Sequence, residues 1–390
     1  MNSFEMYVPT RTLFGAGQLN NLHSQPMPGK KAMLVISNGK STKVNGYLAR
    51  TEEQLKKAGV EYEVFDKVEA NPLKSTVMAG GAFAREKGCD FIVALGGGSC
   101  MDAAKAIAIV ATNDGDLWDY VQCGTGGRKA ITNRPLPIVA ITTTAGTGSE
   151  TDSGGVITNA ETYEKTGIVD PQLFPVLAIV DPELMTSVPP KFTAFQGFDA
   201  LFHSTEGYIS NKANLMSDMI AITAIENVAR SLAAAVRDGH DTEARTRSAF
   251  GNYLSGIQMC VGSCTSEHSL EHAMSAYHQE LPHGAGLIMI SRAYYEFFIK
   301  KGVCPERFVR MARAMGMEDA EKPEDFLTAL TKLQEECGVA DLKMSDYGIT
   351  RDEFEKMAKN AVDSMGWLFT CDPVELSVND CVEIYEKSYR

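Results

Sequence analysis

The sequence predicts an α/β protein whose first half is a mostly parallel sheet covered by helices and whose second half is all helix. The first half contains four short apolar runs, each followed by small or polar residues and separated from the next by helical patterns. Buried runs that alternate with helices are typical of βαβ units with both faces of the sheet covered. The runs lie at Met33–Ile36, Phe91–Leu95, Ile138–Ile141 and Leu177–Val180.

Helical patterns separate the first runs, as at Val44–Ala58 and Met101–Ala111, and they dominate the chain after Asp181. Pro189 and Pro190 interrupt the chain just beyond that point, because proline disfavours helix in the residue before it. We therefore expect two domains, residues 1–187 and residues 188–390. The helices expected in the second lie at Phe192–Tyr208, Met216–Val236, Glu243–Cys260, Pro305–Ala314, Pro323–Cys337 and Arg351–Asp363.

Length and composition restrict the class of protein. A chain of 390 residues predicts two or three domains, and 44% hydrophobic with 22% charged residues is ordinary globular composition. The net charge of −13 argues against nucleic acid or an anionic membrane as the main partner, since both require a basic surface. No run of 18 apolar residues predicts a membrane span, and the start of the chain has no apolar core of signal-peptide length.

The cysteines indicate the compartment. Nine cysteines are scattered along the chain without a CxxC pair. An odd number of unpatterned thiols in a chain of this size favours a reducing environment. We therefore expect a cytoplasmic location.

A glycine-rich turn follows the second apolar run in FIVALGGGSCMDAAKAIA. The glycines at Gly96, Gly97 and Gly98 let backbone N–H groups approach a bulky anion, and the N-terminus of the following helix attracts negative charge. Ser99 and Asp102 have the spacing of a capping box. The turn matches neither GxGxxG nor a Walker loop. We predict phosphate binding here, the alternative being a tight turn that binds nothing.

A second loop of small polar residues, TTTAGTGSE at 142–150, follows the next apolar run. Its hydroxyls and glycines supply donors with little bulk. Two such loops at neighbouring strand ends suit the pyrophosphate and adjacent groups of a dinucleotide. The first half is therefore predicted to be a Rossmann-like dinucleotide-binding domain, although a plain turn would give the same pattern in this loop alone.

Histidine is scarce but clustered. The chain has seven histidines, and four of them lie within residues 268–283. Asp199 and His203 are four residues apart in a helical pattern, as are His268 and His272, and His283 follows in the turn-like LPHGAG. Three imidazoles with one carboxylate suit Fe²⁺ or Zn²⁺. The alternative is a set of structural histidines. Glu206 lies near His203 on the same helix face and is a candidate partner of a ligand.

At this point the sequence resembles the iron-containing alcohol dehydrogenase family over nearly the whole chain. The resemblance rests on GGGSCMDAAKAIA, TTTAGTGSET, GFDALFHSTEGYIS and the HxxxH…PHG segment, in that order. It implies that the metal ligands are Asp199, His203, His268 and His283, and that His272 takes part in proton transfer near the nicotinamide. It implies cofactor contacts at Asn71, Gly97, Gly98, Ser99, Thr143, Thr144, Thr147 and Lys165.

The implied activity is hydride transfer between NAD(P)(H) and a small primary alcohol, diol or aldehyde, with Fe²⁺ as the metal and Zn²⁺ as the second choice. One rival is a lyase related to dehydroquinate synthases, which predicts a basic, phosphate-binding cluster near the metal. Residues 191–283 contain few basic residues near the histidines. The other rival is a non-catalytic metal-binding protein, which would tolerate loss of the glycine turn or of His272. Both are present.

The loop after the first apolar run bears on the choice of cofactor. Many dinucleotide folds place an acidic residue there, which binds the ribose 2′-hydroxyl and repels a 2′-phosphate. The sequence VISNGKSTK has no carboxylate from Ser37 to Val44; Gly39 and Ser41 resemble the version found in NADP-preferring relatives. We therefore expect NADP(H) to be preferred over NAD(H). In that version Ser41 donates to the phosphate, and Lys40 or Lys43 neutralises it. The alternative is that Asn38 binds the ribose and both lysines are solvated.

The start of the chain indicates self-association. The strand-like MYVPTRTLFG has no evident partner hairpin. Its resemblance to the family segment that pairs across a dimer implies a homodimer or a larger homo-oligomer.

Overall fold

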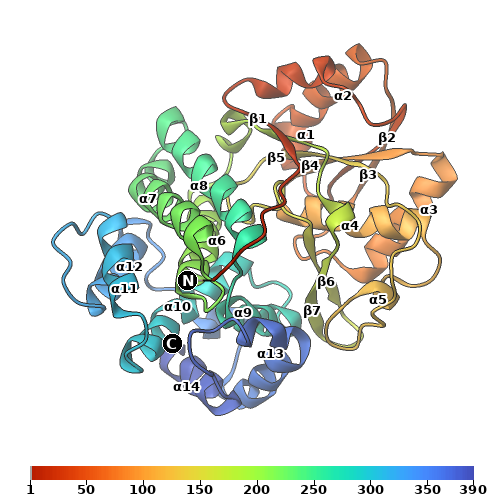
Figure 1. Cartoon of the computed structure of the whole chain (residues 1–390). Coiled ribbons are helices and arrows are strands. Elements are labelled where there is room, and N and C mark those ends of the chain that lie inside the picture. The colour runs from red at the N-terminus through yellow and green to blue at the C-terminus, as the bar shows by residue number, and fades with distance from the viewer. Residues whose placement is uncertain (1) are drawn as a thin grey trace. The chain divides into compact units, whose positions relative to one another are not determined.

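The computed structural model of the chain describes residues 2–390 (Figure 1). Contacts divide the chain into two compact units. The α/β unit comprises residues 8–144 and 148–187. The helical unit comprises residues 188–390 together with the segments 2–7 and 145–147.

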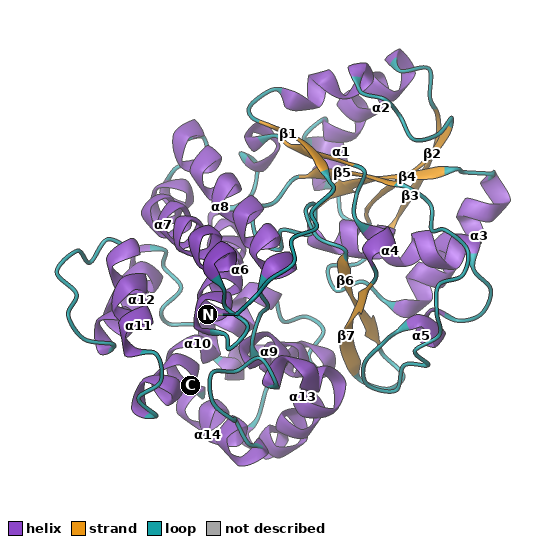
Figure 2. Cartoon of the chain, viewed as in Figure 1, coloured by secondary structure: helices purple, strands orange, loops and turns teal. Residues whose placement is uncertain are grey.

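The α/β unit contains a six-stranded sheet in which every pair of neighbours is parallel, in the order β1-β8-β5-β4-β2-β3 (Figure 2). The four predicted strands are confirmed. Two further strands, β1 and β3, lie at the edges. β1 falls within the segment MYVPTRTLFG that the sequence analysis describes as strand-like, whereas β3 was not predicted, because it has no continuous apolar run. The bounds are β1 Arg11–Phe14, β2 Lys31–Ser37, β3 Glu61–Val68, β4 Phe91–Gly96, β5 Ile138–Thr142 and β8 Leu177–Val180.

Helices cover both faces of this sheet. Met33 and Val35 of β2 pack in one core with the long helix α4 (Gly98–Thr112), while Leu34 packs on the other face in a core with α2. The helix expected at Val44–Ala58 begins only at Tyr47, because Gly46 adopts a left-handed backbone with φ 74° that separates it from a short preceding helix. The other helices are α1 Ser41–Val44, α2 Tyr47–Lys57, α3 Lys74–Lys87 and α5 Leu117–Tyr120.

An antiparallel hairpin, β6 (Gly154–Asn159) with β7 (Glu164–Val169), forms a second sheet in the α/β unit. The sequence analysis did not predict it, since its strands are short and rich in glycine and polar residues. The hairpin carries Lys165, which pairs in register with Thr158.

The helical unit packs its helices around one continuous apolar core. The predicted helices are present, and the last of them begins as a short 3₁₀ turn at Arg351–Glu353 before α13. One helix, α7, is long and apolar enough to cross a membrane, but half of that stretch is buried against its own unit, as in the core helix of a globular domain. The bounds are α6 Pro190–Ile209, α7 Leu215–Arg237, α8 Thr242–Val261, α9 Ser266–Tyr277, α10 His283–Lys300, α11 Pro305–Ala314, α12 Glu324–Glu336, α13 Phe354–Phe369 and α14 Val378–Ser388.

Candidate metal and cofactor sites

Asp199 and His203 lie one turn apart on α6 and face the same way. Both are buried, and Nδ1 of His203 lies 3.6 Å from Oδ1 of Asp199. Much of the helix is apolar and packs in the hydrophobic core, so these two side chains are polar groups buried beside apolar ones. Buried polar groups of this kind require partners from neighbouring elements.

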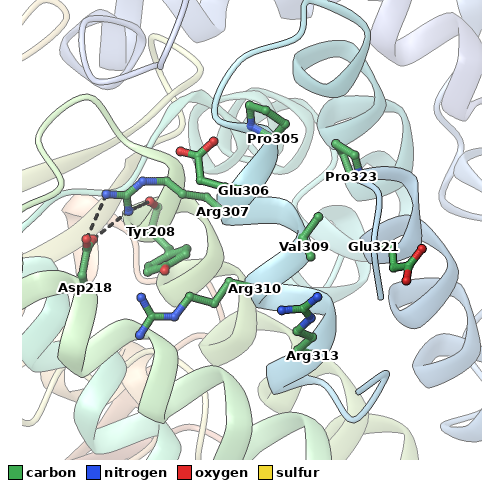
Figure 3. A pocket seen from close by; sticks show the side chains of 10 residues that line it. All are labelled: Tyr208, Asp218, Pro305, Glu306, Arg307, Val309, Arg310, Arg313, Glu321 and Pro323. Atoms are coloured by element: carbon green, nitrogen blue, oxygen red, sulfur yellow. Dashed lines mark hydrogen bonds and ion pairs between the residues drawn. The ribbon is translucent and has the colours of Figure 1, made fainter. Parts of the chain in front are cut away.

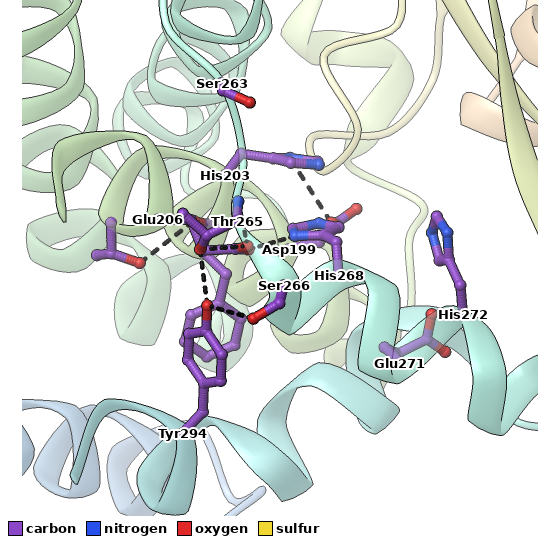
Figure 4. A network of polar contacts seen from close by, with 12 residues as sticks. Asp199, His203, Glu206, Ser263, Thr265, Ser266, His268, Glu271, His272 and Tyr294 are labelled. Atoms are coloured by element: carbon purple, nitrogen blue, oxygen red, sulfur yellow. Dashed lines mark hydrogen bonds and ion pairs between the residues drawn. The ribbon is translucent and has the colours of Figure 1, made fainter. Parts of the chain in front are cut away.

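Those partners come from α9 and α10. Nε2 of His268 and Nε2 of His283 each lie 3.4 Å from Oδ1 of Asp199. The rings of His203 and His268 are stacked, with centroids 4.2 Å apart (Figure 4). The structure thus brings together the four residues that the sequence named as metal ligands, although they lie on three helices.

The arrangement suits a divalent cation. Ligand atoms of Asp199, His268 and His283 lie within 4.8 Å of one another. Nδ1 of His203 is buried, faces Asp199 and has no hydrogen-bond partner among the described residues. An ion bound by imidazole and carboxylate would satisfy this nitrogen, and such a donor set fits Fe²⁺ or Zn²⁺.

A glycine allows α10 to begin where it does. His283 is the first residue of α10, after Pro282. A Cβ on the next residue, Gly284, would collide with the backbone carbonyl oxygen of Phe195 on α6. The first turn of α10 therefore lies directly against the backbone of α6. This close approach positions His283 beside Asp199, which lies one turn further along α6.

The electrostatics of the cluster favour neutral His203 and ionised Asp199. Burial lowers the pKa of His203 to about 3, so its ring carries a lone pair at neutral pH. Burial alone would raise the pKa of Asp199, but the surrounding histidines hold it well below its usual value. Burial alone would also lower the pKa of His268, but Glu206 and Asp199 raise it to about 10.

His272, the predicted proton-transfer residue, lies one turn beyond His268 on α9 and is buried. Its ring centroid is 5.2 Å from that of His283. Its Nδ1 lies 2.7 Å from Sδ of Met365, at a kink in α13. Because a thioether only accepts hydrogen bonds, Nδ1 carries the hydrogen and Nε2 carries the lone pair.

Two residues near the cluster were missed by the sequence analysis. Glu271 of α9 contacts Nδ1 of His283. Cys264 lies just before α9, and its sulfur is within 4.8 Å of ligand atoms of His203 and His268. Glu271 and His283 are twelve residues apart, and no regular spacing in the sequence predicts their contact. Cys264 and His268 are four residues apart, but α9 begins only at Ser266, so this spacing does not place them on one helix face.

The glycine turn lies between β4 and α4, as predicted, but the predicted capping box is wrong. The N-cap residue of α4 is Gly97, which has no side chain to form a capping hydrogen bond. Ser99 instead donates its hydroxyl to the carbonyl of Ala70, and Asp102 accepts from Oγ of Ser149 at 2.6 Å. Because Ser99 and Asp102 bind these neighbouring segments, neither caps α4, and its first N–H groups have no side-chain cap.

The predicted cofactor residues of the α/β unit follow neighbouring strands. Gly96 of β4 pairs with Thr142 of β5, and the amide of Thr143 donates to the carbonyl of Gly96 at 2.9 Å. A Cβ on Gly97 would lie 2.9 Å from a carbon of Thr144. The two small-residue loops therefore touch at the carboxyl ends of parallel strands, where α/β sheets bind ligands.

Asn71 and Lys165 lie near the same turn. The contact between Ser99 and Ala70 brings the loop that contains Asn71 to the start of α4. Leu73 forms a bridge with Thr158, which pairs with the buried Lys165 across the hairpin. By contrast, Thr147 belongs to the helical unit, in a segment whose Ala145 amide donates to the side chain of Gln196 at 3.4 Å.

The loop with Gly39 and Ser41 follows β2, which neighbours β4 in the sheet. β3 lies on one side of β2 in the sheet, and β4 lies on the other side, so the strand order changes direction at this point. Dinucleotides usually bind at such a switch point. The loop itself lacks a carboxylate, but β3 supplies one: Nζ of Lys43 lies 2.6 Å from Oδ2 of Asp66. One of the two lysines expected to neutralise a 2′-phosphate is thus already paired.

A surface pocket of about 600 Å³ on the helical unit involves none of the predicted site residues (Figure 3). Tyr208 lies beneath the guanidinium groups of Arg307 and Arg310, and Arg307 forms a two-pronged ion pair with Asp218. The arginines that line the pocket are balanced by acidic residues that line it too, namely Asp218, Glu306 and Glu321.

Comparison with known proteins identifies the family to which the chain belongs. Residues 9–182 match the iron-containing alcohol dehydrogenase family, and residues 193–389 match the C-terminal region of Fe-containing alcohol dehydrogenases. The chain is 35% identical to 1,3-propanediol dehydrogenase of Klebsiella pneumoniae over 92% of each chain. It is 32% identical to alcohol dehydrogenase 4 of Saccharomyces cerevisiae (strain YJM789) over 98% of each. The archaeal halo-thermophilic Red Sea brine pool alcohol dehydrogenase ADH/D1 has a TM-score of 0.94 at 33% identity, with 99% of each chain covered.

These matches define a metal-dependent oxidoreductase class. The chain belongs to the iron-containing alcohol dehydrogenase family. It is accordingly an alcohol oxidoreductase that works with a metal ion and a nicotinamide dinucleotide.

Proposed function

We propose that this enzyme interconverts a small primary alcohol or diol and its aldehyde, with Asp199, His203, His268 and His283 as ligands of one divalent ion. The observation that carries the proposal is the convergence of two histidine Nε2 atoms on one oxygen of Asp199, each at 3.4 Å. Fe²⁺ is the proposed ion, with Zn²⁺ as the second choice. When bound, the ion supplies Lewis acidity to the oxygen of the alcohol or aldehyde.

The residues of each unit have separate tasks in this proposal. Backbone N–H groups at Gly97, Gly98 and Ser99 bind the pyrophosphate at the start of α4. Asn71, Thr143, Thr144, Thr147 and Lys165 are proposed as further cofactor contacts. His272 accepts the alcohol proton at Nε2, since Nδ1 is directed at Met365 and imidazole is the side chain most often used for proton transfer. We place the functional boundary near residue 187.

The rival functions make different demands. A lyase that binds a phosphorylated substrate requires basic groups at the metal cluster, but the charged groups in contact with the histidines are Asp199, Glu206 and Glu271. Glutamates that contact histidines oppose an anionic substrate. A panel of primary alcohols, diols and aldehydes, followed by the absorbance of reduced nicotinamide, tests the proposal. Turnover with none of them in the metal-loaded enzyme would refute it.

Cofactor preference is the next prediction. We propose that NADP(H) is preferred, because the loop with Gly39 and Ser41 lacks a carboxylate and Lys40 is available to a 2′-phosphate. Gly39→Asp should shift the ratio of kcat/KM toward NADH, because the new charge repels the phosphate. Gly39→Ala is the control and should leave the ratio unchanged. A wild-type enzyme with much higher kcat/KM for NADH would contradict the preference.

Self-association is a further prediction. We propose a cytoplasmic homodimer or larger oligomer. The edge position of β1 supports it, since an edge strand has a neighbouring strand, here β8, on one side of the sheet only. The cysteines at all nine positions are free thiols, which supports a reducing compartment. Light scattering at micromolar concentration should give at least twice the mass of one chain. A monomeric mass would contradict the prediction.

A further inference from the structure

Two fully buried glutamates contact the histidines of the metal cluster from behind. Oε1 of Glu206, on α6, contacts Nδ1 of His268, and Oε2 of Glu271, on α9, contacts Nδ1 of His283. The opposite nitrogen of each ring, Nε2, faces Asp199. Figure 4 shows Glu206 and Asp199 on either side of His268. Each histidine therefore lies between a glutamate and the position proposed for the ion.

Burial of the two glutamates lowers the stability of the fold unless their carboxylates are paired. Neither has any exposed surface, and a buried carboxylate destabilises the fold unless it is well paired. An ionised carboxylate only accepts hydrogen bonds. Each glutamate therefore keeps a hydrogen on Nδ1, so that Nε2 is the nitrogen that gives up its hydrogen when an ion binds.

The surrounding structure holds both carboxylates in place. The other oxygen of Glu206 accepts from the amide and the hydroxyl of Thr265, each at 2.9 Å. Glu271 packs against the first turn of α10, where a Cβ on Gly286 would lie 2.7 Å from its Cγ. The absence of a Cβ at Gly286 thus leaves room for the carboxylate that contacts His283.

We propose that Glu206 and Glu271 are positioning residues that fix the orientation and protonation of His268 and His283 for metal binding. The inference rests on the metal centre of the proposed function. His203 differs from the other two histidines, because its Nδ1 faces Asp199 rather than a glutamate. Partners of ligating histidines typically contribute a factor of about 10 to 100 in metal affinity.

The test measures Co²⁺ affinity by competition with a chelator, together with the visible spectrum of the bound ion. Glu206→Gln and Glu271→Gln preserve shape but remove the negative charge that faces Nδ1, which weakens the preference for a hydrogen on that nitrogen. Each should weaken Co²⁺ binding by about 10- to 100-fold and change the spectrum. Glu206→Asp and Glu271→Asp retain the charged acceptor and should bind Co²⁺ more tightly than the matching Gln variants.

Glu267→Gln is the matched control. Glu267 is also a fully buried glutamate of α9, but neither of its carboxylate oxygens forms a hydrogen bond with a histidine of the cluster. Its amide variant should bind Co²⁺ like the wild type. Wild-type affinity in both Glu206→Gln and Glu271→Gln would overturn the inference, as would Asp variants no better than Gln variants. If the wild type itself bound no Co²⁺, the metal centre of the proposed function would fail as well.

Discussion

Replacing His283 with alanine should remove the metal ion and the activity together. The substitution takes away one of four proposed ligands and leaves Asp199 without one of the two Nε2 atoms that lie 3.4 Å from its oxygen. We expect the loss of metal affinity to exceed the factor of about 10 to 100 that is typical when a residue that hydrogen-bonds to a metal ligand is replaced. Metal content by elemental analysis and turnover with a primary alcohol are the two measurements.

His278→Ala is the control for that experiment. His278 follows α9, and its Nε2 lies 3.1 Å from a carboxylate oxygen of Glu353 rather than near Asp199. This variant loses a histidine from the same segment, yet it should keep both metal and turnover. Normal metal content and turnover in His283→Ala would show that the proposed ligand set is wrong.

Gly284→Ala should disrupt the metal cluster without altering any ligand. The new Cβ would meet the backbone of Phe195, which has no freedom to rotate away, so the first turn of α10 must move from α6. Overpacking of this kind typically costs about 1 to 3 kcal/mol of folding stability. The displacement also moves His283 away from Asp199, so we expect weaker metal binding in addition to a lower Tm.

Gly366→Ala separates this effect from the general consequences of replacing a helical glycine. A Cβ at Gly366, on α13, meets no atom within 4 Å, so no neighbour has to move. We expect its metal affinity to equal that of the wild type and its stability to be unchanged or slightly higher. A Gly284→Ala protein with wild-type Tm and metal affinity would refute the close contact between α10 and α6.

The sequence predicted the central strands because they are buried on both faces. A strand such as Phe91–Gly96 appears as a continuous apolar run followed by a turn. The edge strand Glu61–Val68 has charged residues among its apolar ones, and the strands of the hairpin at Gly154–Val169 are rich in glycine and polar residues. Neither therefore shows a continuous apolar run. Strands of these kinds are defined by tertiary pairing, which local patterns do not record.

The candidate site shows the same division. Asp199 with His203 is visible in the sequence because a helix places residues four apart on one face. The contacts of Glu271 with His283 and of Lys43 with Asp66 join separate elements. Cys264 was missed because α9 begins only at Ser266, so its spacing to His268 is not a helical one. Sequence spacing therefore identified the proposed ligands that share a helix, whereas the residues that contact those ligands became visible only in the fold.

Transfer of deuterium tests the central claim most directly. The metal-loaded enzyme is given a primary alcohol deuterated at its hydroxyl-bearing carbon, and the reduced cofactor is examined by mass spectrometry and NMR. The account predicts deuterium at C4 of the nicotinamide, in wild type but not in His283→Ala. A reduced cofactor without deuterium, or equal transfer in the His283→Ala protein, would contradict the account.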